Sequence, residues 1–188
     1  MYFPGDMTLQ YFFLDTYIGY FLQALPIALV VSALFGFVRF RTDKETPISR
    51  KLFSCAFVCY IMGLVCLVVG LDMMNILWYK LLYHMDPGRT IAWFGGDFDL
   101  MPDFFNNISS ETIGNFLMFL PFGVLYTLSQ KEPIWKKCVI KGLIAVAVIE
   151  ILQPIFGRAF DMNDIILNSL GIVVSTTIFM SVKKIVKR

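Results

Sequence analysis

The chain contains long apolar runs, separated by connections that carry most of its charge. A helix of about 20 mainly apolar residues crosses the roughly 30 Å of hydrocarbon in a bilayer. The 188 residues are 57% hydrophobic and 16% charged, whereas soluble domains have about half and about a quarter of their residues in these classes. The sequence therefore predicts an all-α, polytopic membrane protein, with a single domain over residues 1–188.

Five apolar runs predict a bundle of five transmembrane helices. The first two runs are long enough to cross a bilayer, whereas the last three are shorter and carry polar residues. Either those three helices extend into flanking polar positions, or the bilayer is not crossed by apolar side chains alone. The predicted spans are residues 17–38, 52–71, 111–129, 138–156 and 164–182.

The basic residues predict the orientation. Cytoplasmic connections of membrane proteins carry an excess of Lys and Arg. Thirteen of the 16 basic residues lie in the first connection, the third connection and the tail, which share one side of a five-span protein. We therefore expect the N-terminus outside and the C-terminus in the cytoplasm. These residues are Arg39, Arg41, Lys44, Arg50, Lys51, Lys131, Lys136, Lys137, Lys141, Lys183, Lys184, Lys187 and Arg188.

The longest connection, residues 73–110, is then extracytoplasmic and mixes aromatic with acidic residues. Aromatic side chains are enriched at the level of the lipid headgroups. Residues 73–85 are expected to continue the second helix or to form an interfacial helix, and residues 87–105 to lie as a loop on the outer leaflet. The residues concerned are Trp78, Tyr79, Tyr83, Asp86, Trp93, Phe94, Asp97, Phe98, Asp99, Asp103, Phe104 and Phe105.

Polar residues inside the last three spans mark the first place to look for function, because such groups are rare in membranes. Glu150 and Asn168 lie at similar distances from the turn between the fourth and fifth helices. They should therefore lie at similar depth. Helical spacing places Gln153 on the face of Glu150, and Asp164 on the face of Asn168. With Asn115 in the third helix, these residues should converge in the outer half of the bilayer.

Several acidic and hydroxyl residues near helix starts have a structural alternative. Asp161 and Asp164 can cap the fifth helix, where carboxylates bind free amides and favour the positive end of the helix dipole. Ser109, Ser110 and Glu111 can do the same for the third helix. Capping and a functional role can coexist at all five positions.

Glu150 is the polar residue for which a purely structural role is hardest to assign. Asn115 and Asn168 can serve as interhelical hydrogen-bond partners, and Arg158 can pair with Asp161 or Asp164 near the turn. Glu150 has no capping role and lies roughly 14 Å along its helix from the basic connection. An unpaired carboxylate at this depth is expected to be protonated or bonded to a cation, which favours a functional role.

Two prolines and two glycines shape the same helices. Pro121 and Pro154 each remove one backbone hydrogen bond, which leaves a carbonyl oxygen in need of another partner. Gly123 and Gly171 allow neighbouring helices to approach closely. Gly171 and Ser175 form a pair of small residues at the spacing that favours helix packing.

The combined pattern resembles the VanZ-like family of bacterial membrane proteins. The match covers residues 111–175, and the N-terminal half is similar only in hydropathy. Relatives often carry a further glycine where this chain has Ser175. The matching positions are Asn115, Pro121, Phe122, Gly123, Glu150, Gln153, Arg158, Asp161, Asp164, Asn168 and Gly171.

The resemblance implies an integral protein of the cytoplasmic membrane of a Gram-positive bacterium. Founding members are associated with resistance to teicoplanin and related lipoglycopeptides, without the altered wall precursors that defeat vancomycin. The leading hypothesis is a resistance protein whose outward-facing polar site binds a membrane lipid, a lipid-linked precursor or the antibiotic. The candidate ligand-binding residues are Asn115, Glu150, Gln153, Arg158, Asp161, Asp164 and Asn168.

Two other functions stay open. In a membrane enzyme, Glu150, Asp161 and Asp164 would hold a divalent cation or act as acid and base, with Arg158 on a phosphate. His84 is the only histidine, so no Ser-His or Cys-His arrangement supports this hypothesis. A small transporter is the third class, although the chain has no internal repeat. No cofactor and no nucleic-acid partner are predicted.

Overall fold

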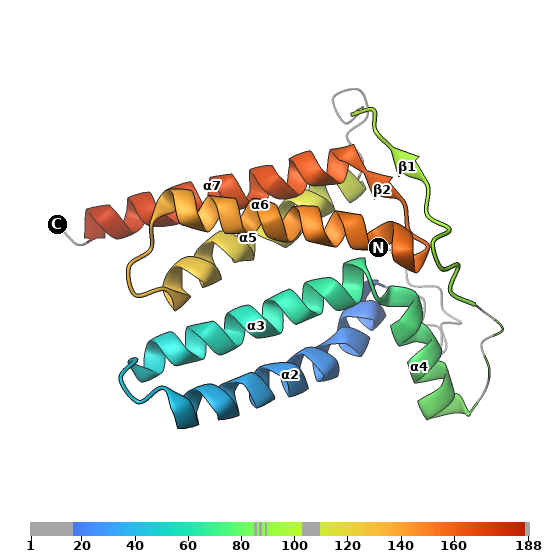
Figure 1. The fold of residues 1–188 in the computed structure, drawn as a ribbon, viewed down its shortest axis with the longest axis horizontal. Helices are drawn as coiled ribbons and strands as arrows, with labels where there is room; N and C mark the ends of the chain where they lie inside the picture. Colours follow the sequence, from blue (N-terminus) through green and yellow to red (C-terminus); the bar gives the residue numbers. More distant parts are fainter. Residues whose placement is uncertain (1–16, 85, 87, 89, 103–109, 187–188) are drawn as a thin grey trace, which may run out of the picture.

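Six α-helices make up most of the described chain, and all but α4 run roughly along the long axis of the molecule (Figure 1). The computed structural model describes residues 17–84, 86, 88, 90–102 and 110–186. The helices are α2 (Tyr17–Thr42), α3 (Ile48–Val68), α4 (Leu71–Tyr83), α5 (Ser110–Ser129), α6 (Trp135–Leu152) and α7 (Met162–Val186).

Four helical segments in the described part of the chain are long and apolar enough to cross a membrane. They are Ile18–Thr42, Ile48–Val68, Trp135–Phe156 and Met162–Val186. The chain is therefore a multi-pass membrane protein, and the last two segments extend beyond their apolar runs as expected. The apolar part of α5, Ile113–Ser129, is shorter. For this reason the count of five spans stays a prediction.

Helix α4 turns away from α3 instead of continuing it (Figure 1). The break lies at Gly70, whose N–H donates to the carbonyl oxygen of Val65 at 3.0 Å and so departs from the α-helical pattern. The helix ends before His84, which has a φ of 51° in the left-handed region. A continuation of the second helix over residues 73–85 is therefore wrong. A separate helix forms there, and its interfacial position stays a prediction.

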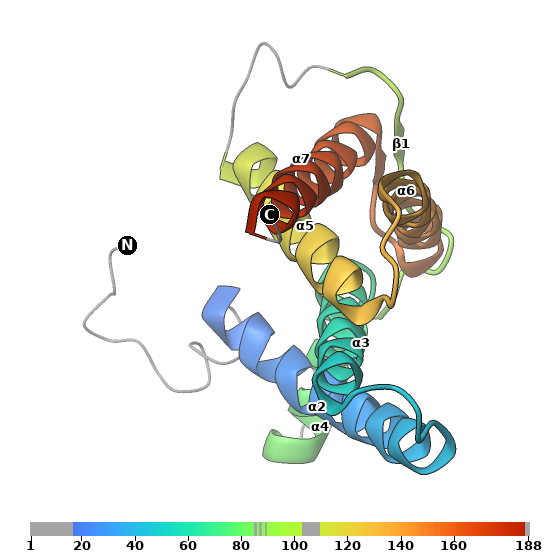
Figure 2. The ribbon, with the colours of Figure 1, turned by 90° about the vertical axis from the view of Figure 1, so that its left-hand side faces the viewer.

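Helix α5 lies at the centre of the bundle, between α7 and α3 (Figure 2). Phe119 and Phe122 are buried in the core, together with Ile172 of α7. The ring of Phe57 in α3 lies 5.2 Å from the ring of Phe122, edge to face. Aromatic pairs prefer this geometry, and this pair contributes to the packing of α5 against α3.

Residues 91–99, here called the strap, lie along the turn between α6 and α7. Strand β1 (Phe98–Asp99) pairs in parallel with strand β2 (Phe160–Asp161). The N–H of Phe94 donates to the carbonyl oxygen of Ile155 at 3.0 Å. Among the described residues this short strand pair is the departure from the predicted all-α class. The predicted loop is thus held by the protein's own backbone.

The turn itself is compact and depends on one glycine. A 3₁₀-helix, η1 (Gln153–Phe156), continues α6 and is followed by Gly157 with a φ of +79°. Side chains rarely tolerate this conformation. A Cβ atom at Gly157 would also lie 2.8 Å from the carbonyl oxygen of Ala92 in the strap. Glycine is therefore needed both for the turn and for the close approach of the strap.

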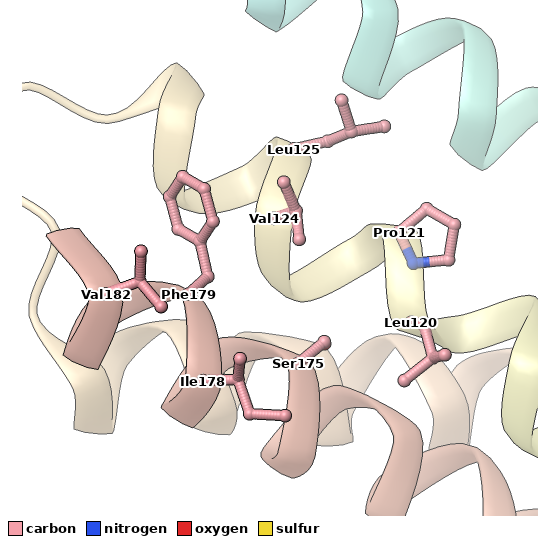
Figure 3. Close-up of a pocket in the computed structure, with 8 residues that line it drawn as sticks. All are labelled: Leu120, Pro121, Val124, Leu125, Ser175, Ile178, Phe179 and Val182. Atoms are coloured by element: carbon pink, nitrogen blue, oxygen red, sulfur yellow. The ribbon is translucent and has the colours of Figure 1, made fainter.

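An apolar groove of about 560 Å³ lies between α5 and α7 (Figure 3). Pro121 lines it from α5, and Ser175 lines it from α7. None of the predicted ligand-binding side chains does so. The lining residues are Leu120, Pro121, Val124, Leu125, Ser175, Ile178, Phe179 and Val182.

Candidate functional site

Three polar side chains meet next to the turn that joins α6 and α7. Gln153 Nε2 donates to Glu150 Oε1 at 3.2 Å, and Asn168 Nδ2 donates to the same oxygen at 3.3 Å. Glu150 is 0% exposed, and both amide side chains are 2% exposed. The structure brings Glu150 and Asn168 together, as their similar distances from the turn predict, and their depth in a bilayer stays a prediction. We call these three residues the buried triad.

The buried triad leaves two oxygen atoms unused. Within the part of the chain that the structure describes, neither Glu150 Oε2 nor Asn168 Oδ1 has a hydrogen-bond partner. A buried acceptor without a partner costs about 1–3 kcal/mol. Unsatisfied groups of this kind call for a specific explanation, and a binding role is one.

A second polar contact joins α5 to the start of α7. Asn115 Nδ2 donates to Asp164 Oδ1. Asp161 caps α7, because its Oδ1 accepts the N–H of Asn163 at 2.7 Å. The capping interpretation of Asp161 and the interhelical role of Asn115 are thus confirmed. Asp164 lies one helical turn before Asn168 in α7, and Asp161 directly precedes this helix, so both lie near the buried triad.

Arg158 is placed differently from its predicted position. We expected it to pair with Asp161 or Asp164, whereas its Nη1 donates to the carbonyl oxygen of Leu67 at 3.3 Å. Leu67 lies in the last turn of α3, where carbonyl groups lack helical partners. Arg158 is exposed, and its charge also acts on the Glu150 carboxyl. It therefore links the end of α3 to the turn beside the buried triad.

The glycines of the motif serve helix packing. A Cβ atom at Gly123 would lie 2.5 Å from the backbone nitrogen of Thr176, and one at Gly171 would lie 2.5 Å from the carbonyl oxygen of Phe116. Real Cβ contacts are not this short. The predicted close approach of α5 and α7 at these glycines is confirmed.

The prolines and the aromatic residue of the motif lie outside the hydrogen-bonded site. Pro121 is exposed and faces the apolar groove, whereas Phe122 is buried in the core. Pro154 is buried in η1, where its carbonyl oxygen accepts the N–H of Gly96 at 3.4 Å. Pro154 therefore contributes to the contact between the turn and the strap.

Some predicted positions fall outside the described residues. Ser109 and the loop residues Asp103, Phe104 and Phe105 belong to this group. The side chains of Ser110 and Glu111 are also outside it. The proposed capping of the third helix by residues 109–111 therefore stays a prediction.

Comparison with known families decides the identity of the chain. The family described as VanZ/LLP1 matches residues 57–184, which is more than half of the 188 residues. The chain belongs to the VanZ/LLP1 family. No curated protein and no solved structure matches it.

The VanZ/LLP1 match reaches well beyond the motif. It begins in α3, at residue 57, and ends near the end of α7. It therefore includes α4, the strap and the Arg158 contact with α3. The similarity expected over residues 111–175 extends into a region where the sequence suggested similarity only in hydropathy.

The described carboxylates of this VanZ/LLP1 protein do not form a compact metal-ligand group. Among the residues the structure describes, no three His, Cys, Asp or Glu side chains are placed to hold a metal ion. A divalent cation at Glu150, Asp161 and Asp164 stays a prediction.

One further residue of the site region was not found from the sequence. Tyr60 in α3 donates its hydroxyl to the carbonyl oxygen of Met118 at 2.7 Å, one turn from Pro121 in α5. A buried tyrosine hydroxyl usually has a hydrogen-bond partner, so a tyrosine inside an apolar run of the sequence indicates a polar contact. It adds a polar contact between α3 and α5 next to the proline.

Proposed function

We propose that this VanZ/LLP1 protein lowers sensitivity to teicoplanin-type lipoglycopeptides by binding a ligand of the outer leaflet at the buried triad. The proposal rests on one observation. Glu150 is fully buried within an apolar helix, yet its Oε2 has no hydrogen-bond partner among the described residues. Intramembrane carboxylates are held at a cost in free energy and occur at binding and transport sites.

The proposed protein has five spans, with its N-terminus outside and its C-terminus in the cytoplasm. The arrangement of the helices supports this orientation. The α2–α3 connection, the α5–α6 connection and the end of α7 lie at one end of the molecule, and these are the segments rich in Lys and Arg (Figure 1). The strap and the α6–α7 turn lie at the other end. The buried triad is then nearer the outer leaflet, where these antibiotics act.

Binding at this depth offers a simple route to resistance. A lipoglycopeptide carries an acyl chain and works at the membrane surface on lipid-linked wall precursors. A protein that holds a lipid, a precursor or the antibiotic near the outer surface lowers the access of the drug to its target. Such an effect needs no change in wall chemistry, so vancomycin sensitivity should stay almost unchanged.

Expression in a sensitive Gram-positive host tests the proposal. We expect the wild-type chain to raise the inhibitory concentration of teicoplanin several-fold, with little change for vancomycin. Glu150→Gln should return it to the level of the empty vector at equal membrane expression. Glu132→Gln, at an exposed position in the α5–α6 connection, is the matched control and should behave like wild type. Equal teicoplanin sensitivity with and without well-inserted wild-type protein contradicts the proposal.

Lipid analysis of the same strains separates binding from catalysis. A binding protein leaves the amounts of membrane lipids and wall precursors unchanged. A product or a depleted precursor that depends on Glu150 would instead favour the membrane enzyme. Mass spectrometry of lipid extracts from the wild-type, Glu150→Gln and empty-vector strains makes this comparison.

A further inference from the structure

The polar site has unused hydrogen-bond acceptors, whereas each of its amide nitrogens already donates one hydrogen bond. The amide donors of Gln153 and Asn168 both reach Glu150 Oε1, and the amide of Asn115 reaches Asp164. The unused atoms are Glu150 Oε2 and Asn168 Oδ1. With Glu150 ionised, both oxygens are acceptors, so a ligand that satisfies them brings N–H or O–H groups.

The charges around the site also favour a ligand that donates hydrogen bonds. Carboxyl groups come from α6 with Glu150, from β2 with Asp161 and from α7 with Asp164. Arg158 is the cation that acts on Glu150, and its guanidinium donates to a carbonyl oxygen of α3. Among the described residues, these three acids and one cation favour a positively charged ligand. A phosphate would add acceptors and negative charge to a site that has a surplus of both.

We propose that the buried triad binds a primary ammonium group, such as the amine of a lipid headgroup. An ammonium carries three donors and no acceptor, so it can satisfy Glu150 Oε2 and Asn168 Oδ1 together. Its charge also compensates that of the carboxylate, and an uncompensated charge buried away from water is strongly destabilising. The inference rests on the proposed function, because it takes the buried triad as the ligand site.

The position of the triad suits a headgroup better than a group deep in the bilayer. Glu150 lies six residues, roughly 10 Å along the axis of α6 and η1, from the end of η1 at Phe156. The strap is hydrogen-bonded across that end, through Phe94 and Ile155. The proposed route for an amine attached to an acyl chain is therefore from the outer leaflet, with its chain in the hydrocarbon.

Lipid retention tests the ligand class. The full chain is reconstituted in nanodiscs that contain equal parts of phosphatidylethanolamine, phosphatidylcholine and phosphatidylglycerol. It is then extracted in mild detergent, and the retained lipids are counted by mass spectrometry. Phosphatidylethanolamine has a primary ammonium, phosphatidylcholine carries the same charge without N–H donors, and phosphatidylglycerol is anionic. We expect several-fold enrichment of phosphatidylethanolamine over both other lipids, lost in Glu150→Gln and kept in Glu132→Gln.

A soluble amine separates a lipid source from another source of the same chemistry. Ethanolamine should raise the melting temperature of the wild-type protein, and choline should not. An ethanolamine effect without lipid enrichment assigns the ammonium to a ligand other than the bulk lipid. Equal retention of the three lipids with no ethanolamine effect overturns the inference, as does preferential retention of phosphatidylglycerol.

The wild-type comparison decides the inference even if a variant does not fold. Asn168→Leu is a second variant that keeps the Glu150 carboxyl and removes one acceptor, and it should lower amine selectivity. The outcome also stands apart from the resistance test. Raised teicoplanin tolerance without amine selectivity rejects the ligand class alone, whereas amine selectivity without tolerance rejects the resistance function alone.

Discussion

Asn168 in α7 donates to Glu150 in α6 at 3.3 Å, although 18 residues and a tight turn separate them in the chain. The contact places an amide and a carboxyl face to face in a fully buried position. Each keeps one oxygen without a partner among the described residues. These two oxygens lower the stability of the fold, and they are also the atoms that the proposed ligand would bind.

Changing one partner of this pair should cost more stability than changing both. Asn168→Leu leaves the carboxyl with one donor fewer, and we expect a loss of roughly 1–3 kcal/mol in the free energy of unfolding. The double variant Glu150→Leu/Asn168→Leu, combined with Gln153→Leu so that no amide of the buried triad loses its acceptor, should be close to wild type in stability, because apolar groups can replace a buried polar cluster. Denaturant unfolding in detergent measures both. Stability losses that simply add up in the combined variant would contradict this coupling between the buried polar groups.

A methyl group at Gly123 should destabilise the contact between α5 and α7. The added Cβ would lie 2.5 Å from Thr176 N, and overpacking of this kind costs about 1–3 kcal/mol. Gly114→Ala is the matched control, because the same helix has open space there. That change should be neutral or stabilising by up to about 1 kcal/mol, since Ala favours helices. Similar melting temperatures for the two variants would argue against the tight packing.

Gly96→Ala should release the strap from the turn. A Cβ atom at Gly96 would collide with the carbonyl oxygen of Arg158 and would lie 2.6 Å from Pro154 Cα. We expect faster proteolytic cleavage in residues 90–100, measured by mass spectrometry, and a small change in the global melting temperature. Thr90→Ala, at an exposed position next to the strap, is the control. Unchanged cleavage of Gly96→Ala would show that the strap tolerates the extra atom.

The α2–α3 connection should lose part of its stability in acid. The backbone N–H of Thr46 donates to Asp43 and holds the pKa of that carboxyl below its ordinary value of 3.8. A lowered pKa in the folded state stabilises the fold above the ordinary value, and this contribution is lost as the pH falls through the folded-state value. The melting temperatures of wild type and Asp43→Asn should therefore differ at neutral pH and converge in acid. A constant difference across the pH range would reject this role.

The helices of the bundle were largely predictable because lipid imposes a strong condition on sequence. Apolar runs long enough to cross hydrocarbon identify α2, α3, α6 and α7. The clustering of Lys and Arg in alternate connections predicts which helix ends lie on the same side. The break at Gly70 was less visible, because apolar residues continue across it into α4. Hydropathy measures the preference of residues for lipid and does not register a change in helix direction.

The polar site was predictable in part for a geometric reason. Equal distances from a short turn bring Glu150 and Asn168 together, and the helical period adds Gln153. Contacts between segments far apart in the chain could not be predicted from helical spacing or from distance to a turn. The strap pairs Phe98 with Phe160, and Arg158 reaches Leu67 across 91 residues.

The sequence by itself determined the membrane class, the positions of the main helices and the VanZ resemblance, and it singled out Glu150 as a candidate residue. These follow from local chemistry, since apolar length, charge and helical period are all read along the chain. The tertiary structure alone decided that Glu150 Oε2 and Asn168 Oδ1 stay without partners among the described residues, and that the strap is bonded to the turn beside them. Both depend on how segments far apart in the chain share space, and hydrogen bonding at a buried site is settled only when every neighbour is in place.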